Sequence, residues 1–303
     1  LWLSENYSID LNRIYMVGGS MGGASGAIYA NNHLNPTRPM VAATASASGI
    51  LDCERRAIEM DGNNSMIEWF GGNWDEVPFE YHRNSAVYFA DSTQSMHYNL
   101  KHTPIYLDFG TTEPHRTHAE DLYNLLLDYN ENMWIDTDPI GSHGYSVIDE
   151  THTCDWLGQF EVIDNPDIIN VNLDEPSRAY WLEAYNQLVS DEFIRLECER
   201  YNENEYYINQ FLNSDTLLFH ILNNTIPSEI QFYNNQSNSI FTIGVTGTSP
   251  LISTISDISF DGFGNYYWDN LTLEDEIVYV DNISAGIYSM TFTVDTDINQ
   301  DGE

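Results

Sequence analysis

The amino-acid sequence predicts an α/β fold with a parallel sheet in its first half, followed by an all-β, sandwich-like region. Up to about residue 160, short apolar runs alternate with segments of helical spacing, which is the pattern of a parallel sheet covered by helices. Beyond that point, short segments of alternating polar and apolar residues are separated by Asn, Gly and Pro, as in β-sandwiches. The chain has 303 residues, 42% of them hydrophobic, which is enough for packed cores in two or three domains.

The first region contains four expected strands, at 13–19, 40–48, 104–110 and 133–140. Strand 13–19 is typical: it reads RIYMVGG, an apolar run that ends in glycines. The expected helices are 21–32, which is rich in small residues, 115–130, which carries leucines at helical spacing, and 151–160. A longer stretch of helix and loop fills residues 53–101, and the chain begins within what reads as a further helix.

The second region begins after a segment rich in Asp, Asn and Pro, residues 161–177, which we expect to be a linker. Residues 178–294 are then expected to form an accessory β-sandwich region of one or two modules, without an internal repeat. Its aromatic residues are expected to face a core rather than a pocket. Its expected strands are 180–185, 193–199, 216–221, 239–245 and 287–294, and the aromatics in question are Tyr180, Trp181, Tyr266, Tyr267 and Trp268.

The charge of the chain is strongly unbalanced, with 47 acidic and 10 basic residues and a formal net charge of −37. Such a surface repels nucleic acids and anionic lipids, so neither is an expected partner. No apolar stretch approaches the roughly 18 residues that a membrane span requires. Adaptation to a saline or calcium-rich habitat and simple solubility explain the charge equally well.

Three cysteines, Cys53, Cys154 and Cys198, allow one disulfide at most. Cys53 and Cys154 each follow a segment that we place near the candidate site, so these two are the expected pair.

The main chemical signal is Gly18-Gly19-Ser20-Met21-Gly22, which matches the G-x-S-x-G pattern directly after an expected strand and before an expected helix. That context places a nucleophilic serine on a tight strand-to-helix turn, where only small residues fit beside it. The backbone N–H of Met21 is then expected to point into an oxyanion site at the helix N-terminus. The alternative interpretation is a glycine-rich turn without chemistry.

The segment Asp10–Gly23, DLNRIYMVGGSMGG, resembles the α/β-hydrolase serine enzymes. It is similar to secreted esterases of the polyhydroxyalkanoate-depolymerase and feruloyl-esterase type, and to prolyl-oligopeptidase-like peptidases. The resemblance covers residues 1–160 and implies a triad in the chain order Ser, acid, His. It also implies secretion. In this family the early strands, and the loop with the second oxyanion donor, precede the matched segment, so we expect an incomplete hydrolase sheet made of its C-terminal half.

The resemblance places the acid three residues after the glycine that ends a late strand, which here is Glu113, with Asp108 within the strand as the alternative. It places the base after the last strand, which favours His143 over His152 at the start of the closing helix. His115 and His118 have a spacing that suggests a metal, but no further ligands accompany them in the sequence. We therefore expect both to be solvated helix residues.

The C-terminal residues 295–303 have the spacing of the start of a dockerin-type calcium loop. Its oxygen ligands are expected to be Asp297, Asn299 and Asp301, although a chance arrangement in an acidic tail remains the alternative. A structural calcium ion there, and attachment to a surface or scaffold, are the implied partners.

The function that the sequence predicts is hydrolysis of a small or polymeric carboxylic ester through an acyl-enzyme, without a catalytic cofactor. The alternatives are a serine peptidase of the prolyl-oligopeptidase type, and a non-catalytic surface- or carbohydrate-binding protein with a relic hydrolase domain.

Overall fold

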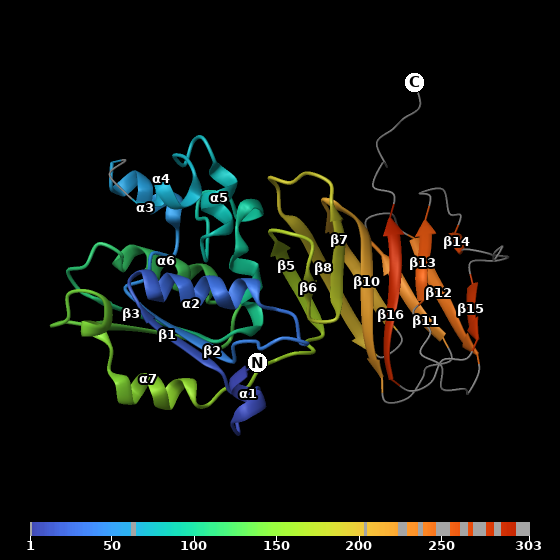
Figure 1. The fold of residues 1–303 in the computed structure, drawn as a ribbon, viewed down its shortest axis with the longest axis horizontal. Coiled ribbons are helices and arrows are strands. Elements are labelled where there is room, and N and C mark those ends of the chain that lie inside the picture. The colour runs from blue at the N-terminus through green and yellow to red at the C-terminus, as the bar shows by residue number, and fades with distance from the viewer. Residues whose placement is uncertain are drawn as a thin grey trace. The chain divides into compact units, whose positions relative to one another are not determined.

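The structure, a computed structural model, divides into two compact units, Leu1–Asp164 and Asn165–Glu303, which are described separately (Figure 1). The residues described are 2–61, 65–202, 205–223, 229–235, 239–246, 255–260, 266–268, 277–281 and 286–294.

Unit 1 contains a four-stranded parallel sheet in the order β1-β2-β3-β4. Strands and helices alternate along the chain, which confirms the predicted α/β class. The elements of the sheet and its covering helices are β1 (Tyr15–Gly19), α2 (Met21–Asn32), β2 (Ala43–Ala47), β3 (Ile105–Gly110), α6 (Arg116–Leu126), β4 (Met133–Asp138) and α7 (Glu150–Leu157), and α1 (Trp2–Asn6) precedes them.

Helices cover both faces of this sheet (Figure 1). Ile105 and Leu107 of β3 pack in a core cluster with residues of α2 and α6, such as Ala27 and Leu122. Tyr106 points to the opposite face and packs with Trp156 of α7. Alternate residues of β3 therefore serve two cores, which is why the whole strand is buried.

The stretch between β2 and β3 forms short helices: α3 (Cys53–Glu59), α4 (Met66–Phe70), α5 (Pro78–Arg83), η1 (Ser92–Gln94) and η2 (Met96–His102). Asp52 caps α3 by accepting a hydrogen bond from the backbone N–H of Arg55. Cys53 is buried in a third core cluster with Met66 and Tyr81.

The expected disulfide between Cys53 and Cys154 does not form, because all three cysteines are free. Cys53 is buried beside α5, where its Sγ lies 3.1 Å from the backbone oxygen of Asn84. Cys154 is exposed on α7, the helix that covers the other face of the sheet.

The described residues of unit 2 form two six-stranded sheets, β14-β13-β16-β10-β7-β6 and β15-β12-β11-β9-β8-β5. Most neighbouring strands are antiparallel, and three pairs are parallel: β9 with β11, β12 with β15, and β13 with β16. The strands are β5 (Ile168–Leu173), β6 (Arg178–Ala179), β7 (Leu182–Gln187), β8 (Ile194–Asn202), β9 (Glu205–Leu212), β10 (Ser214–Asn223), β11 (Glu229–Asn234), β12 (Ser239–Thr246), β13 (Ile255–Phe260), β14 (Tyr266–Trp268), β15 (Ile277–Asp281) and β16 (Gly286–Val294).

Two details of unit 2 bear on the sequence analysis. Strand β5 lies inside the segment 161–177 that we expected to be a linker, and it pairs with β8. Tyr180 and Trp181 are buried, as expected of core aromatics. The proposed calcium ligands Asp297, Asn299 and Asp301 lie outside the described residues. Within the described part of the chain, no helix is both long and apolar enough to cross a bilayer.

Candidate active site

Ser20 lies on the sharp turn between β1 and α2, at the carboxyl edge of the parallel sheet. Its backbone has φ 56° and ψ −121°, a conformation that residues other than glycine rarely adopt. The turn is held by a 2.7 Å hydrogen bond from the Ser20 N–H to the carbonyl of Ala47 on β2. A strained turn of this kind lifts the serine hydroxyl out of the sheet, as a nucleophile requires.

Gly18 makes the turn sterically feasible. A Cβ atom at this position would lie 2.1 Å from the carbonyl oxygen of Gly22 and 2.7 Å from the backbone nitrogen of Gly23. Both contacts are with backbone, so only a glycine permits the first turn of α2 to pack this closely on the end of β1. A Cβ atom at Gly22, the other glycine of the pattern, would meet no atom within 4 Å.

The N-terminus of α2 follows Ser20 directly, since Met21 is the first residue of this 12-residue helix. The first N–H groups of a helix have no partner within it, and they carry its partial positive charge. The Met21 N–H is therefore suitably placed to stabilise a negative oxygen that develops beside Ser20.

His143 belongs to the loop that follows β4, and its Nε2 lies 2.8 Å from the Oγ of Ser20. Ser146 fixes this loop: its hydroxyl accepts a hydrogen bond from the His143 N–H and donates one of 2.8 Å to the His143 carbonyl. Two strand-end glycines let the loop approach. A Cβ at Gly19 would lie 2.9 Å from the nitrogen of Tyr145, and one at Gly110 would lie 2.2 Å from the oxygen of Gly141.

Glu113 lies in the turn between β3 and α6, and its Oε2 is 2.8 Å from Nδ1 of His143. Its side chain is fully buried, whereas that of His143 is 44% exposed. A carboxylate only accepts, so Nδ1 carries the proton. Nε2 is then free to accept a proton from the Ser20 hydroxyl, and the three side chains form a continuous hydrogen-bonded series from solvent to the buried acid.

The two alternative residues lie on the α7 face of the sheet and are not brought to Ser20. On β3, Asp108 lies between Leu107 and Phe109, which face α2 and α6, so its own side chain faces the other side of the sheet. It is paired in register with Asp136 of β4. Burial, and then the nearby Asp136 charge, raise the pKa of Asp108 to about 7. His152 packs against the rings of Tyr106 and Trp134, with centroids 5.9 and 5.4 Å away.

His115 and His118 are buried, so the expectation that they are solvated is wrong. Nδ1 of His115 lies 2.9 Å from the backbone oxygen of Ser48. Nδ1 of His118 accepts a 3.3 Å hydrogen bond from the Asp52 N–H. Burial lowers the pKa of both rings, to about 4 for His118. The spacing of His118 with Leu122 and Leu126 was a signal for burial that sequence reasoning overlooked.

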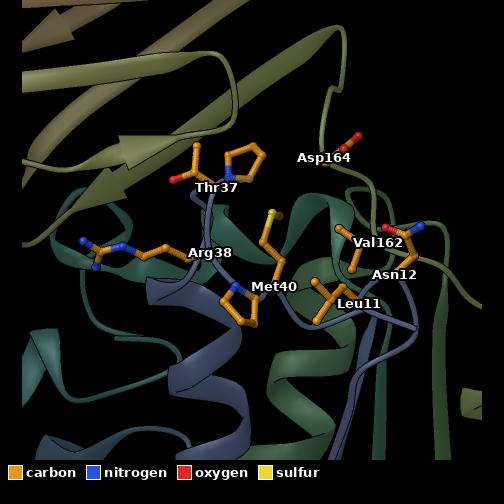
Figure 2. A pocket seen from close by; sticks show the side chains of 9 residues that line it. Leu11, Asn12, Thr37, Arg38, Met40, Val162 and Asp164 are labelled. Carbon is orange, nitrogen blue, oxygen red and sulfur yellow. The ribbon is translucent and has the colours of Figure 1, made fainter. Parts of the chain in front are cut away.

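A cavity of about 110 Å³ opens at the opposite edge of the sheet, where β1 and β2 begin (Figure 2). None of the residues near Ser20 lines it. Figure 2 shows the apolar side chains of Leu11, Met40 and Val162 gathered around it. Its lining residues are Leu11, Asn12, Pro36, Thr37, Arg38, Pro39, Met40, Val162 and Asp164.

Comparisons with known proteins give partial structural likenesses. No protein-family model matches the chain, and no curated protein sequence does either. Similar solved structures include the acylaminoacyl peptidase of Pyrococcus horikoshii, at 17% identity and a TM-score of 0.35, matched over 46% of this chain and 21% of that one.

Two further similar structures are a hydrolase and an esterase. The S-formylglutathione hydrolase of Staphylococcus aureus is 15% identical with a TM-score of 0.38, over 52% of this chain and 59% of that one. An esterase of Pyrobaculum calidifontis is 16% identical with a TM-score of 0.35, over 52% and 55%. The chain thus spans between about a fifth and three fifths of these proteins, and TM-scores this low assign no function.

Proposed function

We propose that this chain carries the catalytic site of a serine hydrolase that cleaves carboxylic esters through an acyl-enzyme. Ser20 is the nucleophile, His143 the general base, and Glu113 the acid that orients the imidazole. The observation that supports this proposal is the hydrogen-bonded series from Ser20 Oγ through His143 to Glu113, with both contacts at 2.8 Å. Nucleophile, base and orienting acid within hydrogen-bond reach are the signature of this chemistry.

In the acylation step, Ser20 Oγ attacks the ester carbonyl while its proton passes to Nε2 of His143. The negative oxygen of the tetrahedral intermediate accepts a hydrogen bond from the Met21 N–H. His143 then donates its proton to the departing alkoxide, which leaves as the alcohol, and the acyl group remains on Ser20. In deacylation His143 takes a proton from water and the hydroxide attacks the acyl carbon. The bond from the acyl carbon to Ser20 Oγ then breaks, His143 returns the proton to Oγ, and the carboxylic acid leaves.

The burial of Glu113 supports its role beside an exposed base. When His143 becomes an imidazolium, its Nδ1–H faces a carboxylate that water does not reach, so the attraction is weakly screened. The charge of Glu113 thus stabilises the form of His143 that exists in the transition state. Loss of the acid in such a series lowers turnover by about 10⁴-fold where it has been measured.

The remaining parts of the chain have proposed roles that rest on sequence alone. We propose that residues 178–294 are an accessory region that attaches a secreted enzyme to a polymer or cell surface. Residues 295–303, with Asp297, Asn299 and Asp301, are proposed as the start of a calcium loop. The ester is the proposed substrate class, and a peptide is the competing one.

A fluorophosphonate probe tests the catalytic proposal, because it reacts with an activated serine hydroxyl. The chain should be labelled on Ser20, and Ser20→Ala should abolish labelling. Ser25→Ala is the matched control: Ser25 lies on the same helix, is exposed, and its hydroxyl donates a hydrogen bond to the Met21 carbonyl. Labelling that persists in Ser20→Ala, or an unlabelled native chain, would refute the proposal. Faster turnover of peptides than of matched esters would replace the ester by a peptide substrate.

A further inference from the structure

The proposed triad overlaps a second cluster, in which His115 joins Glu113 and His143. One donor atom from each of these three side chains lies within 4.8 Å of the other two. Among the described residues this is the one group of three His, Cys or carboxylate side chains that meets this spacing. Two imidazoles and a carboxylate are a ligand set that Zn²⁺ takes in proteins.

Two potential metal-ligating atoms of the cluster form no hydrogen bond with the described residues, although both are buried. Glu113 uses Oε2 for His143, and its Oε1 is unsatisfied. His115 uses Nδ1 for the Ser48 carbonyl, and its Nε2 is unsatisfied. A buried polar atom without a partner is unfavourable, so a ligand that engages these atoms recovers part of that cost.

The hydrogen bond that His115 forms through Nδ1 leaves the lone pair of its Nε2 available to a metal. A carbonyl oxygen only accepts, so Nδ1 of the neutral ring carries the proton and Nε2 presents its lone pair. Histidines that ligate metals almost always donate their other N–H to a carbonyl or carboxylate in this way. The ring also lies edge-on to His143, with centroids 5.2 Å apart.

We propose that Glu113, His115 and His143 bind a divalent transition-metal ion such as Zn²⁺, and that this ion inhibits the hydrolase. Both ring nitrogens of His143 are already hydrogen-bonded, one to Ser20 and the other to Glu113. An ion on either nitrogen therefore breaks a hydrogen bond of the triad, so metal binding and catalysis exclude each other. The inhibitory effect rests on the proposed function, whereas the binding does not.

The cluster must rearrange to hold the ion, because Oε2 of Glu113 and Nδ1 of His143 lie only 2.8 Å apart, and the burial of the ligands indicates which residue moves. Ligand atoms of tetrahedral zinc are about 3.3 Å apart, since each bond is roughly 2.0–2.1 Å. Glu113 and His115 are buried, whereas His143 is exposed on a loop with Gly144 in a left-handed conformation. His143 is therefore the ligand that we expect to shift when the ion enters, and the shift takes its ring away from Ser20.

The binding test uses the Ser20→Ala variant of the 303-residue chain, which keeps all three ligands and lacks the proposed nucleophile. Zn²⁺ titrated into it by calorimetry should show one tight site, and adding His115→Asn should weaken that site at least tenfold. His33→Asn is the matched control, because Nδ1 of the exposed His33 also faces a backbone carbonyl, that of Tyr29, at 3.1 Å. Equal affinity with and without His115 would overturn the proposal.

Two further arms keep the test decisive. If circular dichroism shows that His115→Asn does not fold, His143→Asn replaces it, because His143 is exposed and its loss must weaken the same site. In the native chain, the rate of p-nitrophenyl acetate hydrolysis should fall as the Zn²⁺ concentration approaches the dissociation constant measured for Ser20→Ala. A chelator should restore the rate. Unchanged or increased hydrolysis at saturating Zn²⁺ would overturn inhibition. A native chain without any hydrolysis would instead count against the proposed function, while the titration still decides the metal site.

Discussion

At the scale of residues, the proposed site combines a fully buried acid with a base that is 44% exposed. The burial of Glu113 keeps its carboxylate away from water, while the exposure of His143 gives substrate and water access to Nε2. The same arrangement leaves His115 buried beside both. None of these burial differences follows from residue type, because nine histidines and 47 acidic residues compete in the sequence.

The first prediction concerns the orienting acid. Glu113→Gln should lower the turnover of a small ester by roughly 10³ to 10⁴-fold, because the imidazolium loses its charged partner. KM and the thermal midpoint should change little. Glu120→Gln, which removes an exposed carboxylate that pairs with Arg116 at 2.9 Å, is the control. Turnover of Glu113→Gln within threefold of native would remove Glu113 from the mechanism.

The second prediction concerns Asp108, whose folded pKa of about 7 lies above its ordinary value of 3.8. Between these pH values the folded chain binds more protons than the unfolded one, so the free energy of unfolding falls as pH rises from about 4 to about 7. Asp108→Asn removes this dependence. Above pH 7 it should be more stable than native by up to a few kcal/mol, as measured in urea titrations.

Asp138 is a control for which the expected pH dependence of stability has the opposite sign. The N–H groups of Gly141 and Ile140 donate to its carboxylate and lower its pKa, so its contribution is present above about pH 4 and lost in more acidic solution. Asp138→Asn should therefore be less stable than native at neutral pH. Asp108→Asn should also keep its esterase turnover. A large loss of turnover would return Asp108 to the role of triad acid.

At the scale of elements, the site depends on glycines at strand ends. Gly18 allows the first turn of α2 to pack closely on the end of β1. Gly19 and Gly110 allow the loop that carries His143 to approach the ends of β1 and β3. The positions of these glycines come from backbone packing between elements that are far apart in sequence. The motif made Gly18 and Gly22 look equivalent, but only the structure shows that one is confined and the other is open.

The third prediction compares the two motif glycines. Gly18→Ala places a Cβ 2.1 Å from the Gly22 carbonyl, so it should lower the thermal midpoint by several degrees and abolish fluorophosphonate labelling. The new Cβ of Gly22→Ala meets no atom within 4 Å. The substitution also lowers the conformational entropy of the unfolded chain, so the thermal midpoint should be unchanged or higher. Equal thermal midpoints for the two variants would contradict this prediction, because the backbone around Gly18 would then accommodate a Cβ at little cost in stability.

The strands and the covering helices of unit 1 were predictable from local patterns, whereas the individual short helices between β2 and β3 were not. Apolar runs marked β1 to β4, and leucines at helical spacing marked α6. Strand β5 was missed because Asp, Asn and Pro around it suggested a linker, although Ile169, Val171 and Leu173 alternate and are buried. The parallel pairs of unit 2, such as β9 with β11, join strands that are not neighbours in sequence, so no local pattern specifies them.

At the scale of the whole molecule, all residues of the proposed triad lie in unit 1. Ser20, Glu113 and His143 all precede Asp164, where unit 1 ends, and so do the three core clusters that support them. Sequence order alone placed these three residues in one domain, because the strands that carry them alternate with helices.

The last prediction is that unit 1 hydrolyses small esters without unit 2. A protease site inserted at 161–164 allows the full chain to fold before it is cut, and the purified N-terminal part should keep kcat/KM for p-nitrophenyl acetate within about threefold. The reason is that these three buried clusters are formed by residues of unit 1. Attachment to an insoluble polyester, in contrast, should weaken after the cut. The uncut chain and a cut Ser20→Ala chain are the controls. If the folded N-terminal part loses most of its kcat/KM on the small ester, then unit 2 contributes to substrate binding, and the proposal that it is only an attachment region is wrong.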